Sequence, residues 1–155
     1  MIRNDITIRP ERPEDFAEIE QLVLRAFAER TGYSDGTGEV ALINEIRAGR
    51  YYKPELSFVA LLGEKIVGHF MFSGFPLSPT KEGGYDPEAT TDLIMLAPVA
   101  VHTDHYRQGI GETMLRLGIE QAKQLDYKGI TVEGDFHFYN RLGFETSTKY
   151  GIHAT

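Results

Sequence analysis

The 155-residue chain contains no cysteine, which excludes a disulfide framework, a thiolate zinc site and a cysteine nucleophile. It also lacks an apolar run of the about 18 residues that a membrane-spanning helix needs. Basic side chains are in the minority, since 16 Lys and Arg face 23 Asp and Glu, and the formal net charge is −7. This charge disfavours general attraction to nucleic acid or to an anionic membrane, so an anionic ligand has to be bound by a local group of residues.

What the chain does have is the ordinary composition of one globular domain, with 41% hydrophobic residues. We therefore expect a single domain over residues 1–155. The first ten residues carry charges at Arg3, Asp5 and Arg9 and no apolar stretch, which is typical of neither a signal peptide nor a transit peptide. A soluble, cytoplasmic protein is the expectation that follows.

Hydrophobic periodicity predicts a strand, two helices, a hairpin, a buried strand, a helix, a strand, a short helix and a last strand, with a polar loop of three glycines at 29–38 and a Gly- and Pro-containing loop at 76–91. Strands are expected at 6–8, 56–62, 66–75, 93–101 and 129–133, and from residue 144 onward. Helices are expected at 13–28, 40–48, 109–125 and 138–142, the last one capped by Gly143. This order predicts an α/β fold with a mixed, mostly antiparallel central sheet and helices on both faces.

The segment 93–101, LIMLAPVAV, is continuously apolar, so we expect it inside the sheet rather than at an edge. Pro98 lacks the N–H that a strand donates to its neighbour, and the sequence therefore predicts a bulge or a loss of pairing beside it. In the helix that follows, Gly118 costs about 1 kcal/mol of helix propensity but would allow a close approach to the sheet.

Between that strand and that helix lies a polar turn, from Tyr106 to Glu112, with the sequence YRQGIGE. A helix N-terminus carries unpaired N–H groups and partial positive charge, and its glycines let an anion come close. Arg107 would add a formal charge, so the turn is a candidate phosphate site. A P-loop is excluded because no lysine follows Gly111, and a dinucleotide fingerprint is disfavoured because Met114 stands where its third glycine belongs. The alternative is that the glycines only form a tight turn.

The turn from Tyr106 to Gly111 resembles the Gln/Arg-x-x-Gly-x-Gly/Ala motif of the Gcn5-related N-acetyltransferase (GNAT) superfamily, with Tyr106 standing at the Gln/Arg position. About thirty residues later, FYNRLGF at 138–144 resembles the second superfamily motif, FYxxxGF. The Gly-Asp pair at 134–135, just before this motif, resembles the sequence found there in a branch of small bacterial predicted acetyltransferases called YhbS-like. Both motifs stand in the order and at the spacing of that superfamily.

This resemblance implies an enzyme that uses acetyl-coenzyme A (acetyl-CoA) as co-substrate and transfers the acetyl group directly to a primary amine of a small molecule or peptide. In the superfamily the turn binds the pyrophosphate and the bulged strand binds the pantetheine arm. The implied cofactor-binding residues are Val99, Ala100, Val101, Tyr106, Arg107, Gln108, Gly109, Ile110, Gly111 and Glu112. Tyr139 is the implied general acid toward the departing thiolate, and a phenol with a pKa of about 10 suits that role.

Several questions stay open at the level of the sequence. The group that takes the amine's proton is Asp92, His69, His102, Glu133 or water, although a histidine in an apolar strand, such as His69, is more often a hydrogen-bonded core residue. The acceptor pocket would be lined by the first two helices and the loops after them, where the tyrosines 33, 51 and 52 fall, together with the loop 76–91.

Other functions are also kept open. A non-catalytic acyl-CoA binding module, or a nucleotide-binding protein of different chemistry, would use the same turn. No metal site is expected, because the histidines and acids show no HExxH or similar spacing. The open edge of a short last strand allows a homodimer.

Overall fold

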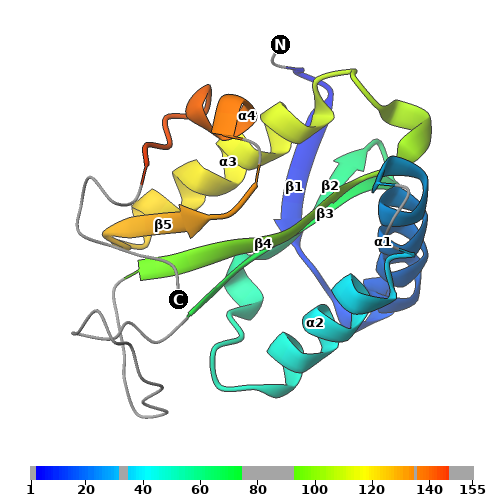
Figure 1. The fold of residues 1–155 in the computed structure, drawn as a ribbon, viewed down its shortest axis with the longest axis horizontal. Coiled ribbons are helices and arrows are strands. Elements are labelled where there is room, and N and C mark those ends of the chain that lie inside the picture. Colours follow the sequence, from blue (N-terminus) through cyan, green and yellow to red (C-terminus); the bar gives the residue numbers. More distant parts are fainter. Residues whose placement is uncertain (1–2, 32–34, 75–92, 135, 147–155) are drawn as a thin grey trace.

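The computed structural model describes residues 3–31, 35–74, 93–134 and 136–146, which form one sheet between two layers of helices (Figure 1). The strands are, in spatial order, β1 (Ile6–Pro10), β2 (Ser57–Leu62), β3 (Lys65–Gly74), β4 (Leu93–Val101) and β5 (Gly129–Val132). The helices are α1 (Phe16–Thr31), α2 (Thr37–Ala48), α3 (Ile110–Gln124) and α4 (Phe136–Asn140). Short 3₁₀ helices lie at Pro13–Asp15, Pro54–Leu56 and Thr103–His105.

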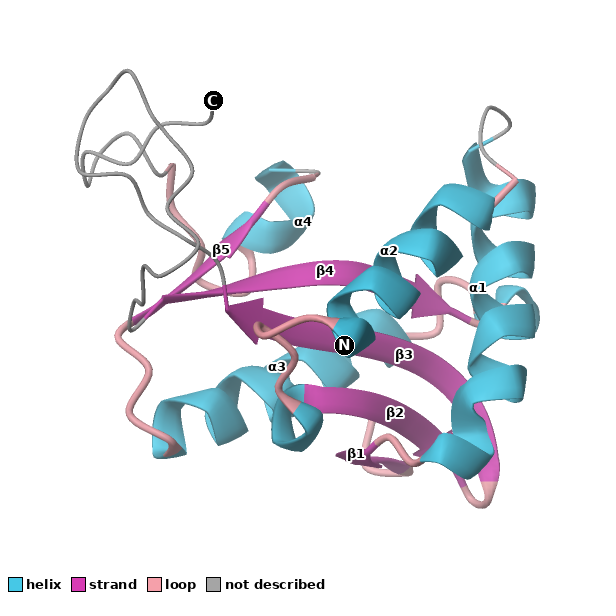
Figure 2. Ribbon diagram, turned by 90° about the horizontal axis from the view of Figure 1, so that it is seen from below, coloured by secondary structure: helices cyan, strands magenta, loops and turns pink. Residues whose placement is uncertain are grey.

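The sheet is mixed and mostly antiparallel, which confirms the fold predicted from the sequence. Strands β1 to β4 pair antiparallel with their neighbours, whereas β5 pairs parallel with β4 because α3 returns the chain across the sheet between them. The pairing of β4 with β5 covers only 93–96 and 129–132. Strand β5 ends there, whereas β4 continues to Val101 (Figure 2).

The helices cover both faces of the sheet, α3 on one side and α1 with α2 on the other (Figure 2). Each face has its own hydrophobic core. The core beneath α3 is made of Ile6, Leu56, Phe58, Ala60, Val67, Phe70, Phe72, Ile94, Leu96, Ile110, Met114, Leu115 and Ala122. The core beneath α1 and α2 is made of Ile19, Leu22, Val23, Ala26, Ile43, Val59, Ile66, Met71 and Ala100.

A bulge interrupts β4 at the position that the sequence predicts. Val99 pairs with Phe70 and Leu96 pairs with Phe72, so two residues of β4, one of them Pro98, face a single residue of β3. An extra residue of this kind bends a strand and leaves part of its backbone unpaired. The strand also lies between β3 and β5, as its apolar sequence predicts.

The bulge reverses which residues of β4 face α3. Ile94 and Leu96 belong to the core beneath α3, and after the bulge Val99 and Val101 pack against that same core. Ala100 belongs to the core on the opposite face. A regular strand would alternate without interruption, so the extra residue is what turns the side chains of Val99 and Val101 toward α3.

Gly118 lets α3 lie close to the sheet, as the sequence suggests. A Cβ atom added there would overlap the ring of Phe70 and lie 3.3 Å from Cε2 of Phe72. We expect Gly118→Ala to lower the free energy of unfolding by about 1–3 kcal/mol, because overpacking a filled core forces its side chains out of place. Urea unfolding followed by circular dichroism measures this loss.

The control for that experiment is Gly38→Ala in α2, where an added Cβ would have no heavy atom within 4 Å. This substitution should raise stability, because alanine is the better helix former. A Gly118→Ala variant at least as stable as the unmodified protein would contradict the prediction.

Some predicted boundaries are wrong by a few residues. Helix α1 continues to Thr31, past the predicted loop start at Glu29, and an i,i+4 ion pair of 3.0 Å between Arg25 and Glu29 adds to the stability of its last turns. Helix α4 lies two residues earlier than the predicted 138–142. The predicted loop 76–91 lies outside the described residues.

The predicted last strand does not begin at Phe144. Residues 144–146 are not in a strand, and the rest of the predicted strand lies outside the described residues. Instead, the N–H of Phe144 donates to the carbonyl of Tyr139 at 3.2 Å, and its own carbonyl accepts from Nδ2 of Asn140 at 3.0 Å. Gly143, with a φ of +99°, lies in the turn after α4 and donates its N–H to the carbonyl of Asn140 at 3.0 Å, so it does not follow the helix directly as predicted.

Candidate active site

The predicted phosphate turn connects β4 to α3 through an irregular backbone. Arg107 has a φ of +58° and Gly109 a φ of +80°, so two left-handed residues flank Gln108. A left-handed conformation is uncommon for a residue other than glycine, and such residues cluster where a backbone is shaped for binding. Turns of this type bring N–H groups together into concavities that hold anions.

The N–H groups of this turn are available to a ligand. Within the part of the chain that the structure describes, no backbone or side-chain acceptor bonds to the N–H groups of 107–111, and Gly109 at the start of α3 has no side-chain cap. The first hydrogen bond of the helix runs from the N–H of Thr113 to the carbonyl of Gly109, at 3.0 Å. These free donors therefore lie at the positive end of the α3 dipole.

Arg107 is the cation available at this turn. Its side chain is exposed and has no ion pair or hydrogen bond among the described residues. The other charged groups nearby are engaged: Arg116 holds Glu112 at 3.0 Å, and Nη1 of Arg3 donates to the backbone and side-chain oxygens of Gln108 at 3.4 and 3.3 Å. The side chain of Glu112 is thus directed to Arg116.

Gly111 lies where β4, α3 and α4 meet, but the fold itself does not require glycine there. Its φ is not left-handed, and an added Cβ would lie 3.6 Å from Val101 Cγ2 and 3.8 Å from Phe138 Cζ, which are ordinary contacts. Glycine at this position keeps the space beside Val101 and Phe138, next to the turn, free of a side chain.

The ring of Tyr139 is held in place from several sides. It packs edge-on against Phe138 at 5.1 Å and against Phe144 at 5.8 Å between ring centroids. Gly134 lies so close that an added Cβ would be 2.8 Å from Cε2 of the tyrosine. Nη2 of Arg116 donates to the carbonyl of Arg141 at 3.0 Å, which ties the end of α4 to α3.

The pantetheine-binding residues predicted by resemblance lie where β4 has lost its partner. Val99 and Val101 are half-buried beside the core under α3, together with Phe138 and Tyr139, whereas the side chain of Ala100 is buried on the other face. Because β5 pairs only as far as Leu96, no strand among the described residues covers this edge of 97–101. The edge can bind an extended chain.

A family model described as "Acetyltransferase (GNAT) family" matches residues 17–144. The chain belongs to this family. A curated relative, the uncharacterized N-acetyltransferase YjhQ of Escherichia coli (strain K12), is 31% identical over 131 residues. The match covers 84% of this chain and 65% of that relative, so the chain spans just under two thirds of its length.

Solved structures of GNAT proteins share the fold. A GNAT family acetyltransferase from Brucella melitensis in complex with acetyl-CoA is 30% identical, with a TM-score of 0.77 over 93% of this chain and 85% of that chain. The structure of YhbS from Escherichia coli in complex with CoA is 24% identical, with a TM-score of 0.76 over 94% of this chain and 72% of that chain. The family suggested by two short motifs is therefore confirmed.

Of the candidate proton acceptors for a GNAT reaction, the two histidines are already engaged. His69 is fully buried, with Nε2 2.8 Å from Oε1 of Glu11, so it is a hydrogen-bonded core residue. His102 accepts from the N–H of Asp104 at 3.2 Å through Nδ1, and burial lowers its pKa, followed by the charge of Lys65. Glu133 is exposed directly after β5, and Asp92 lies outside the described residues.

The sequence analysis missed a buried polar cluster centred on Glu11, in the segment after β1. The carboxylate accepts from Arg47 Nε at 3.0 Å and Nη2 at 2.8 Å, from the hydroxyl of Tyr52 at 2.7 Å, and bonds to His69. Burial alone would raise the pKa of Glu11, but the hydrogen bonds from His69, Arg47 and Tyr52 outweigh it and lower the pKa to about 2. A histidine within an apolar strand was the only sequence signal of this cluster.

Of the three tyrosines predicted near an acceptor, Tyr52 therefore belongs to this buried cluster. Tyr51 lies against Gly74 at the end of β3, where its carbonyl accepts from the glycine N–H at 3.0 Å. Tyr33 lies outside the described residues. Within the described ranges no group of three or more His, Cys, Asp or Glu could hold a metal ion, and no helix there is long and apolar enough to cross a membrane.

Proposed function

We propose that the protein is an acetyl-CoA-dependent N-acetyltransferase that transfers the acetyl group directly to a primary amine, without a covalent acetyl-enzyme. The observation that carries the proposal is the set of free N–H groups at 107–111 beside Gly111, a glycine that neither the backbone conformation nor the packing requires. Membership of the acetyltransferase family and the acetyl-CoA and CoA complexes of its structural relatives support it.

In this proposal the turn binds the pyrophosphate of acetyl-CoA through its N–H groups and the guanidinium of Arg107. The pantetheine arm lies along the unpaired edge of 99–101, which places the thioester toward Tyr139. The amine nitrogen attacks the thioester carbon, strand N–H groups stabilise the oxyanion, and the carbon–sulfur bond breaks. The hydroxyl of Tyr139 gives its proton to the leaving thiolate.

The acceptor in this proposal is a small-molecule or peptide amine. The net charge of −7 favours a cationic acceptor through electrostatic attraction. Because both candidate histidines are already engaged, we propose that water takes the proton that the amine must lose. Tyr106, which replaces the Gln or Arg of the family motif, favours one second candidate, a non-catalytic acyl-CoA binding module on the same fold.

Calorimetric titration with acetyl-CoA tests the proposal. The unmodified protein should bind in the micromolar range, and Gly111→Val should bind at least about tenfold more weakly, since its side chain blocks the approach of the phosphates to the N–H groups. Gly111→Ala, whose added atom makes only ordinary contacts, provides a milder variant that should stay folded.

The matched control is Gly38→Val, at an open position of α2 outside the turn, which should bind acetyl-CoA as the unmodified protein does. Circular dichroism confirms that each variant is folded. Failure of the folded, unmodified protein to bind acetyl-CoA would refute the proposal, and so would unchanged binding by Gly111→Val.

A further inference from the structure

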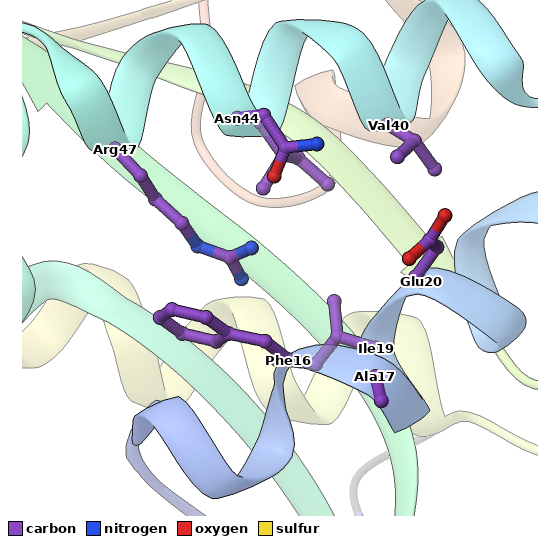
Figure 3. A pocket seen from close by; sticks show the side chains of 8 residues that line it. Phe16, Ala17, Ile19, Glu20, Val40, Asn44 and Arg47 are labelled. Atoms are coloured by element: carbon purple, nitrogen blue, oxygen red, sulfur yellow. The ribbon is translucent and has the colours of Figure 1, made fainter.

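A groove lies on the sheet face that α1 and α2 cover, opposite the face that α3 covers. It has a volume of about 240 Å³ and runs between α1 and α2 (Figure 3). Its walls are apolar and come from Phe16 and Ile19 on one helix and from Val40 and Ile43 on the other. Its volume lies just below the about 300 Å³ at which typical ligand sites begin, so the groove suits a small molecule.

Arg47 presents a fixed hydrogen-bond donor at one end of the groove. Two of its nitrogens, Nε and Nη2, are held by the carboxylate of Glu11 at 3.0 and 2.8 Å, and its guanidinium carbon lies 3.6 Å from the centre of the Phe16 ring. Its side chain is only 12% exposed. The third nitrogen, Nη1, has no hydrogen bond among the described residues. This nitrogen is a planar donor that is already oriented for a carboxylate.

Glu20 presents the opposite chemistry at the other end of the groove, with Asn44 between the two (Figure 3). Its carboxylate has no ion pair or hydrogen bond within the described part of the chain. The charge of Arg47 is balanced by Glu11, so the charge of Glu20 is the one left uncompensated along the groove. A donor for a carboxylate and an acceptor for an ammonium thus lie at the two ends of one apolar groove.

We propose that this groove binds a small aliphatic amino acid as its zwitterion. The ligand's carboxylate accepts from Nη1 of Arg47, its ammonium group binds the carboxylate of Glu20, and its side chain packs against Val40 and Ile43. The site lies on a different sheet face from the acetyl-CoA turn. The titration below needs neither acetyl-CoA nor acetyl transfer, so this proposal and the proposed acetyltransferase activity can each fail without the other.

The test is a titration of the ¹⁵N-labelled protein with L-leucine, without acetyl-CoA, followed by amide chemical shifts. Shifts are expected at residues 16–20 and 40–47, and not in the turn 106–111. Glu20→Gln should weaken binding about tenfold, the usual size of a lost charge-assisted contact. Glu18→Gln, an exposed residue of the same helix outside the groove, is the matched control and should bind as the unmodified protein does.

Two analogues of L-leucine separate zwitterion recognition from simple apolar binding. 3-Methylbutylamine lacks the carboxylate and 4-methylpentanoate lacks the ammonium, so each should bind about tenfold more weakly than L-leucine. The proposal is overturned if L-leucine shifts no groove amide at millimolar concentration, if Glu20→Gln binds as well as Glu18→Gln, or if either analogue binds as tightly as the amino acid.

Discussion

Tyr139→Phe is expected to lower kcat by about 10²–10⁴ while leaving the Kd for acetyl-CoA nearly unchanged. The substitution removes one oxygen atom and keeps the ring, which packs against Phe138, Phe144 and the backbone of Gly134. What is lost under the proposed mechanism is the proton for the leaving thiolate. Steady-state rates with an amine acceptor, combined with calorimetric titration of acetyl-CoA, measure the two quantities separately.

The matched control is Tyr127→Phe, which removes the same atom from a tyrosine outside the proposed site. Its ring lies under Nζ of Lys53, 5.1 Å from the ring centroid, and packs on the edge of the core under α3. Its kcat should stay within a small factor of that of the unmodified protein. Equal rates for Tyr139→Phe and the unmodified protein would remove Tyr139 as the acid, and would leave the acyl-CoA binding module as the better reading.

Replacing Glu11 by Gln is expected to lower the free energy of unfolding by about 3–5 kcal/mol, because it leaves Arg47 buried without its counter-charge. All of the side-chain oxygen capacity of Glu11 is used, by His69, Arg47 and Tyr52. Urea unfolding followed by circular dichroism measures the change. The exposed pair Arg3 and Asp5 offers a control, because Asp5→Asn breaks an ion pair of 2.7 Å in contact with water and should change stability little.

The same cluster gives the unmodified protein a defined response to acid. The pKa of Glu11 is about 2 in the folded chain, below its ordinary value of 4.5, so its contribution is complete above about pH 4.5 and is lost as the pH falls toward 2. Burial lowers the pKa of His69, so the unfolded chain takes up that proton first, and this too lowers stability as the pH falls below 6.5. Glu11→Gln should flatten the lower part of this profile. A loss below about 1 kcal/mol for Glu11→Gln, or an unmodified protein equally stable at pH 5 and pH 3, would contradict this account.

Much of the fold follows from local sequence patterns. The apolar run of β4 and the stripe of α3 are each encoded in one contiguous segment, and Pro98 predicts its bulge because the missing N–H is a property of that residue alone. The prediction that a last strand begins at Phe144 was wrong, because the N–H and the carbonyl of Phe144 form hydrogen bonds with Tyr139 and Asn140 of α4. That choice depends on the geometry of the preceding helix, which no pattern of apolar residues records.

The phosphate turn and the buried cluster around Glu11 differ in how far the sequence could predict them. The turn 106–111 is contiguous, so its glycines and its arginine could be recognised together. The buried cluster joins Glu11, Arg47, Tyr52 and His69, which lie in four separate segments and meet only after the sheet and α2 have formed. Arg47 continues the apolar stripe of α2 in the sequence, and its buried carboxylate partner comes from another part of the chain.

The bulge at Pro98 makes β4 depend on its length as well as on its side chains. Deleting one of the two residues between Leu96 and Val99 would restore regular pairing and leave the residues that follow on their present faces, because the bulge holds one residue in excess. Pairing the full strand without a bulge would instead turn Val99 and Val101 toward α1, and Ala100 toward α3. The bulge is therefore the place where this strand can lose a residue and keep its inside and outside, whereas a deletion elsewhere in the strand exchanges the faces of the residues that follow it.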